Sequence, residues 1–138
     1  MNCKAMLRGG ALAMVLMAGA AGAHHSFAMF DQAKTVTLKG AVVEFQWTNP
    51  HAWIEVDVPN AKGVKERWGV ELNSPNNLTR QGWRRSTLKA GDAVTITINP
   101  LRNGKKGGLF NTIVLPDGKM LGGERAVDGK AINVPTAN

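Results

Sequence analysis

Three histidines are the residues of this 138-residue chain whose types and spacing point most directly to chemistry. His24 and His25 are adjacent, and His51 lies further along the chain. A cut after Ala23 would make His24 the N-terminal residue, so that its amine and its ring nitrogen chelate one metal ion together. The imidazole of His51 would then complete a three-nitrogen site of the kind called a histidine brace. Because nitrogen ligands in a planar or T-shaped arrangement suit Cu(II), we expect copper as the cofactor.

Two alternatives to the brace remain open. A cut one residue earlier would leave Ala23-His24-His25, in which the third-position His25 binds Cu(II) through the terminal amine and the intervening amides. Otherwise His24 and His25 are polar residues at a chain start, and His51 is a residue that shapes a turn. Zinc is less favoured than copper, because the sequence shows no closed set of three or four zinc ligands.

The first 23 residues decide which of these sites exists, and they have the order of a secretory signal peptide. A basic start precedes an apolar run at 11–20, and small residues follow at 21–23. The run is far shorter than the roughly 20 apolar residues of a transmembrane helix. We therefore expect cleavage after Ala23, with a second possible site of small residues that ends at Ala20.

Cleavage changes the chemistry that is available to the mature chain. Residues 1–23 hold the only cysteine, Cys3, and two of the 17 basic residues, but none of the 10 acidic residues. The mature chain therefore keeps a positive charge and has no thiol for a disulfide, so its hydrophobic core must stabilise it. We expect a periplasmic or secreted protein.

Most of the remaining sequence alternates apolar and polar residues with a period of two, which predicts β-strands. The predicted strands cover 34–47, 51–58, 66–73, 93–99 and 109–115. The alternation changes phase near Gly40, which predicts a bulge or a sharp bend in the first strand. Ser74-Pro75 before residues 76–81 and Gly82 after them predict one short helix.

This order of elements predicts an all-β fold, a small five-stranded OB-fold-like barrel with one short helix between strands 3 and 4. A β-sandwich is the rival, but it needs about seven strands and has no place for the helix. The predicted organisation is a signal peptide at 1–23, an N-terminal segment at 24–33, the barrel at 34–122 and a polar tail at 123–138. The expected core residues face inward and are Val36, Leu38, Val43, Phe45, Ile54, Val56, Val70, Leu72, Val94, Ile96 and Ile98.

The hairpin of the second and third predicted strands has one polar face. This face combines aromatic and basic side chains, with further cations in nearby loops, which is the composition of a groove for an anionic glycan, lipid or other polymer. Specific binding of nucleic acid is not expected of an exported protein. A structural role beside an envelope protein or an anionic surface remains open as a further alternative. The residues assigned to the groove are Trp53, Arg67, Glu71, Arg84 and Arg85.

No pattern in the sequence specifies a reaction. The part after residue 23 has three serines and no cysteine, and none of the serines lies in the G-x-S-x-G pattern of a hydrolase. Glu55, Asp57 and Glu71 are interpreted as solubilising residues of a polar strand face rather than as paired catalytic carboxylates. The Gly-rich loop at 102–108 lacks the spacing of a phosphate-binding loop. We therefore expect a binding protein that is not an enzyme.

A set of short motifs extends over residues 24–121. It comprises His24-His25-Ser26-Phe27, Phe30-Asp31, Gly40-x-Val42, Trp47-x-Asn49-Pro50-His51, Trp68-x-Val70-Glu71, Gly82-Trp83 and Gly91-Asp92. In these motifs the chain resembles a family of small exported bacterial proteins of unknown function, the DUF6152 type. The resemblance implies export and a single domain. It implies no activity, because the family has none that is established.

Overall fold

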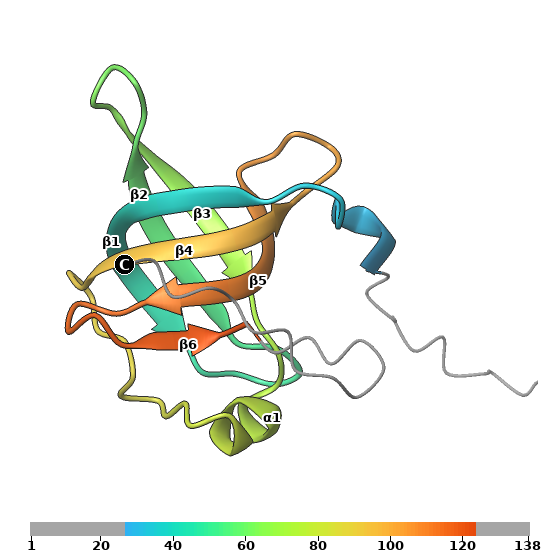
Figure 1. The fold of residues 1–138 in the computed structure, drawn as a ribbon, viewed down its shortest axis with the longest axis vertical. Coiled ribbons are helices and arrows are strands. Elements are labelled where there is room, and N and C mark those ends of the chain that lie inside the picture. Colours follow the sequence, from blue (N-terminus) through green and yellow to red (C-terminus); the bar gives the residue numbers. More distant parts are fainter. Residues whose placement is uncertain (1–26, 124–138) are drawn as a thin grey trace, which may run out of the picture.

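The structure is a computed structural model that describes residues 27–123, which form a β-barrel with one short helix outside it (Figure 1). The elements are η1 (Phe27–Met29), β1 (Val36–Gln46), β2 (Trp53–Pro59), β3 (Lys65–Glu71), α1 (Pro75–Arg80), β4 (Ala93–Pro100), β5 (Gly107–Val114) and β6 (Met120–Gly122). The predicted order of strands and the helix between β3 and β4 are confirmed.

Several predictions from the sequence lie outside the described residues. These are the signal peptide at 1–23, the ligands His24 and His25, and almost all of the tail at 123–138. Among the helices of residues 27–123, none has the length and apolar character that crossing a membrane requires.

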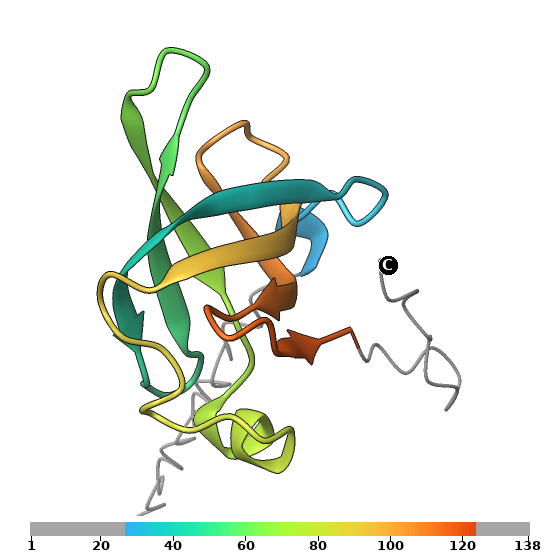
Figure 2. The same cartoon turned by 60° about the vertical axis from the view of Figure 1, so that its left-hand side comes forward.

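Five strands close into a barrel through one parallel contact. The strands lie in the order β3-β2-β1-β4-β5 with antiparallel neighbours, and β3 also pairs with β5 in parallel. The sixth strand, β6, extends the sheet beyond β5. The β2–β3 hairpin projects from one end of the barrel, and α1 lies at the opposite end (Figures 1 and 2). This closed topology with its helix between β3 and β4 is that of the OB-fold, as predicted.

Glycines allow the closing strands to approach one another. Gly107 pairs with Gly69 of β3, and a Cβ atom at Gly107 would lie 2.9 Å from the Gly69 carbonyl oxygen. A Cβ atom at Gly108 would lie only 2.4 Å from the carbonyl oxygen of Asn99. Assigning both glycines to the loop at 102–108 was therefore wrong, because β5 begins at Gly107. Their lack of a side chain serves close packing between strands rather than a turn.

The bulge in β1 lies beyond the position that the sequence indicated. Val42 pairs with Val56 and Glu44 with Glu55, so Val43 is the extra residue, and the bulge predicted near Gly40 lies three residues further along β1. Gly40 continues the inward phase, where a Cβ atom would meet the Asp57 carbonyl oxygen at 2.2 Å. Val42 takes the core position that the sequence assigned to Val43, because the extra residue shifts the alternation only after Val42.

The remaining core prediction is confirmed, and further residues join the core, of which Trp83 has the largest side chain. Eight of the predicted residues are buried, and Val36 and Phe45 pack against the core while partly exposed. Trp83 is also fully buried and was not predicted. The buried residues that confirm the prediction are Leu38, Ile54, Val56, Val70, Leu72, Val94, Ile96 and Ile98.

The end of α1 explains the burial of Trp83. Ser74 caps the start of the helix by accepting a hydrogen bond from the Asn77 N–H, as its place before Pro75 predicted. At the other end the Trp83 N–H donates to the Leu78 carbonyl and the Gly82 N–H donates to the Thr79 carbonyl. This is a Schellman motif, in which the residue after the glycine packs on the last turn. A tryptophan directly after a helix-ending glycine was the signal for this buried position.

Gly108→Ala should lower the free energy of unfolding by ~1–3 kcal/mol, because the added Cβ overpacks the backbone of β4. Gly69→Ala is the matched control, since no atom lies within 4 Å of a Cβ there, and it should change stability by less than ~0.5 kcal/mol. Urea denaturation of both variants measures the difference. Equal stability of the two variants would contradict the close approach at the closure.

Candidate functional site

His51 lies in the loop between β1 and β2, and the β2–β3 ladder determines its position. The Ala52 N–H donates to the Asn73 carbonyl at 3.1 Å, and the Leu72 N–H donates to the Ala52 carbonyl at 2.9 Å. The two segments that flank β2 and β3 thus stay paired beyond the ends of these strands. Side chains of a residue and its diagonal neighbour on the facing strand lie within reach of one another. His51 therefore faces Glu71, the last residue of β3.

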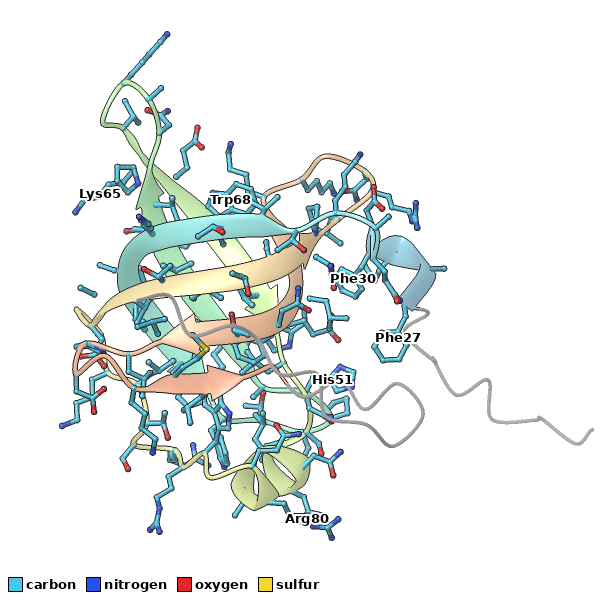
Figure 3. The ribbon with its side chains drawn as sticks, viewed as in Figure 1. Phe27, Phe30, His51, Lys65, Trp68 and Arg80 are labelled. Carbon is cyan, nitrogen blue, oxygen red and sulfur yellow. The ribbon has the colours of Figure 1, made fainter. Side chains whose placement is uncertain are left out.

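The imidazole of His51 forms a short hydrogen bond with Glu71, between Nδ1 and Oε1. The Glu71 side chain is 5% exposed and the His51 side chain is 34% exposed. A buried carboxylate requires a hydrogen-bond donor, and His51 provides one. The loop itself is held by the Thr48 hydroxyl, which donates to the His51 carbonyl at 3.1 Å. Figure 3 shows His51 at the margin of the barrel, on the side of the view where Phe27 also lies.

This hydrogen bond determines which ring nitrogen can bind a metal. When Nδ1 donates its proton to Glu71, the lone pair of the neutral ring is on Nε2. Histidines that coordinate metals usually donate their other ring N–H to a carboxylate or a carbonyl in this way. Residues 27–123 contain no group of three or more His, Cys, Asp or Glu that could hold a metal ion. His51 can therefore contribute one nitrogen ligand, and its predicted partners His24 and His25 lie outside the described residues.

The polar face of the β2–β3 hairpin has the predicted residues but an unexpected balance of charge. Trp53 pairs with Glu71 and Asp57 with Arg67, so these side chains share one face. The Arg67 guanidinium donates to Asp57 at 2.6 Å and to Glu55 at 2.8 Å. The hydrogen bond from Arg67 lowers the pKa of Asp57, and the same bond to the Asp57 carboxylate raises the pKa of Arg67. Arg67 is thus neutralised by its neighbours, which disfavours its predicted contact with an anionic polymer.

Arg84 and Arg85 do not lie on this face. Both follow α1 and line a groove with Trp47, Thr79 and Ser86. The five residues that the sequence assigned to one groove therefore occupy two places, the hairpin face and the loop after the helix. Trp47 is a groove residue that was not assigned, although its place at the end of a predicted strand beside a loop was a signal for it.

Arg67→Ala should raise the pKa of Asp57 toward its ordinary value of 3.8, because the largest cause of its lowered value is the hydrogen bond from Arg67. A carboxylate with a lowered pKa in the folded state stabilises the fold above about pH 4, and this contribution is lost as the pH falls through the folded-state value. NMR titration of the Asp57 carboxyl measures the shift. An unchanged pKa of Asp57 in the variant would show that the pair does not form in solution.

Comparisons with known proteins give one family and a distant structural likeness. A family model described as "Family of unknown function (DUF6152)" matches residues 12–111. No curated protein sequence matches the chain. A crystal structure of the mitochondrial single-stranded DNA binding protein Rim1 from S. cerevisiae is 11% identical, with a TM-score of 0.46, over 59% of this chain and 92% of that chain. Its selenomethionine-labelled form is 10% identical, with a TM-score of 0.42 over the same shares.

Proposed function

The chain belongs to the DUF6152 family, whose function is unknown, and we propose that it is an exported, non-enzymatic barrel of the OB-fold type that binds one copper ion. The ligands are the amine and ring of His24, which becomes the first residue when 1–23 are removed, and Nε2 of His51. The observation that supports this proposal most strongly is the hydrogen bond of His51 to the buried Glu71 carboxylate. It orients the ring as a metal ligand requires.

The described start of the chain is anchored to the barrel by the residues that follow β4. The Arg102 N–H donates to the Met29 carbonyl at 2.9 Å, and Phe30 forms a β-bridge with Leu101. Leu101 in turn donates to the carbonyl of Gly107, which pairs with β3 two residues before Glu71. The three residues from His24 to Ser26 can span roughly 10 Å when extended. The proposed site requires that this span bring the new N-terminus to His51.

Copper is the metal that this donor set favours. The proposed ligands are all nitrogen atoms, and Cu(II) has the highest affinity for such sites among the divalent first-row metals. Amine and imidazole nitrogens bind a metal only when they are deprotonated, so affinity should fall as the pH is lowered. Glu71 would stay in place as the hydrogen-bond acceptor that orients His51 without binding the ion itself.

Glu71→Gln should weaken Cu(II) binding about 10-fold or more, because loss of the charged acceptor makes the His51 ring a poorer ligand. His51→Ala should retain only the two nitrogens of His24 and should change the electron paramagnetic resonance spectrum. Glu55→Gln is the control, since Glu55 lies on the same face but contacts Arg67. Copper titration with a competing chelator measures all three affinities. The same loss in Glu55→Gln, or unchanged affinity and spectrum in His51→Ala, would remove His51 from the site.

A protein that retains Ala23 before His24 should lose the brace, because the amine is then one residue away from the ring. Mass spectrometry first verifies that the reference protein begins at His24, as export with cleavage after Ala23 requires. Cu(II) titration then compares the two proteins at pH 7.5 and pH 5.5. Tighter binding by the protein that begins at Ala23, lost in its His25→Ala variant, would replace the brace with the third-position site. A mature protein that still begins at Met1 would contradict the cleavage on which both sites depend.

A further inference from the structure

A groove outside the barrel, at the end where α1 lies, has a charge balance unlike that of the hairpin face. Trp47, Arg84, Arg85, Thr79 and Ser86 line it, and we call it the Trp47 groove. It is formed by the last turn of α1, the loop that follows and the chain just after β1. None of these residues takes part in the proposed copper site, so the groove is a separate feature.

The segment around this groove is strongly cationic. Residues 72–91 contain four basic residues and no Asp or Glu. Within residues 27–123, none of the four forms an ion pair, whereas Arg67, Arg102 and Lys106 each have a carboxylate partner. The acidic residues at the two ends of the segment are already used, since Glu71 bonds to His51 and Asp92 accepts from the Lys89 N–H. The four basic residues are Arg80, Arg84, Arg85 and Lys89.

The wall of the groove is built of aromatic rings that pack on one another. Trp47 packs edge to face on Phe45 at 5.5 Å between ring centroids, and Phe45 contacts Trp83 at 5.9 Å. Trp83 packs in turn on Phe110, which joins the wall to β5. Arg85 is tied to the wall because its guanidinium donates to the Trp47 carbonyl at 3.3 Å. An indole face with guanidinium groups beside it can bind a ring that carries an acidic group.

The wall also contains an unused donor. The indole Nε1 of Trp83 is buried and has no hydrogen-bond partner among the described residues. Buried donors without a partner are rare in proteins, and an unseen acceptor is one explanation for them. Trp83 is one of the residues that line the groove, and its side chain is fully buried behind the surface.

We propose that the Trp47 groove binds a sugar that carries a carboxylate or a phosphate. The sugar ring packs on the indole of Trp47, and the acidic group lies between Arg84 and Arg85. The planar guanidinium fork matches the two oxygens of either acidic group. Ser86 and the exposed end of α1 offer polar contacts for the sugar hydroxyls. This site binds its ligand independently of copper.

Calorimetric titration of the protein with oligogalacturonate, with its fully methyl-esterified form and with glucose 6-phosphate tests the proposal. Oligogalacturonate or glucose 6-phosphate should bind, and the esterified sugar should bind about 10-fold more weakly or not at all, because it lacks the charge. The stronger of the two acidic ligands identifies the acidic group. Binding of the esterified sugar with equal affinity, or binding of neither acidic ligand, would overturn the proposal.

Variants separate a specific site from general charge attraction. The double variant Arg84→Gln, Arg85→Gln should lower the affinity about 10-fold or more, since two charge-assisted contacts are lost. The double variant Lys62→Gln, Lys65→Gln removes the same charge from the β2–β3 hairpin and should retain affinity within about two-fold. His51→Ala should also retain it, which keeps this test separate from the copper proposal. Equal losses in the two double variants would show that only net charge attracts the sugar.

Discussion

The parallel contact between β3 and β5 is the constraint on which the rest of this structure depends. It converts a five-stranded sheet into a barrel, and it requires glycine at 107, where a side chain would collide with the backbone of β3. Gly108 is required on the other edge of β5, where a side chain would collide with the backbone of β4. The parallel contact also pairs Glu71 with Leu109 and thereby buries the end of β3. A carboxylate in that position needs a donor, and the β1–β2 loop supplies the ring of His51. The oriented imidazole is thus a consequence of how the barrel closes.

Charge pairing divides the surface into two regions with different capacities for ligands. On the hairpin face Arg67 forms ion pairs with both Glu55 and Asp57. The two carboxylates neutralise the guanidinium and leave the face acidic. Around the Trp47 groove the cations have no acidic partners within residues 27–123, and an aromatic wall lies beside them. The acidic hairpin face can favour the cationic ligand that we propose near His51, and the cationic Trp47 groove can favour the anionic ligand that we propose there. The net charge of the chain does not reveal these two regions, because they depend on which charged side chains the fold brings together.

Local signals in the sequence predicted the elements well, and long-range contacts explain what they missed. Period-two alternation placed the strands, and Ser74 and Gly82 marked the helix. The start of β5 was missed because Gly107 and Gly108 have the composition of a loop, and only the contact with β3 reveals their role. The pairing of His51 with Glu71 was missed for the same reason, since it depends on diagonal register across a hairpin. Glu71 therefore looked like a solubilising residue of a polar face although it is buried.

The central claim is that Glu71 orients His51 as a copper ligand through Nε2, and nitrogen NMR of the His51 ring tests it most directly. In ¹⁵N-labelled protein that begins at His24, the ring should show a protonated Nδ1 and an unprotonated Nε2 before metal is added. Substoichiometric Cu(II) should then broaden the His51 ring signals before those of any histidine introduced at a surface position away from the site. A ring with the proton on Nε2, or His51 signals that stay sharp at one equivalent of Cu(II), would contradict the account.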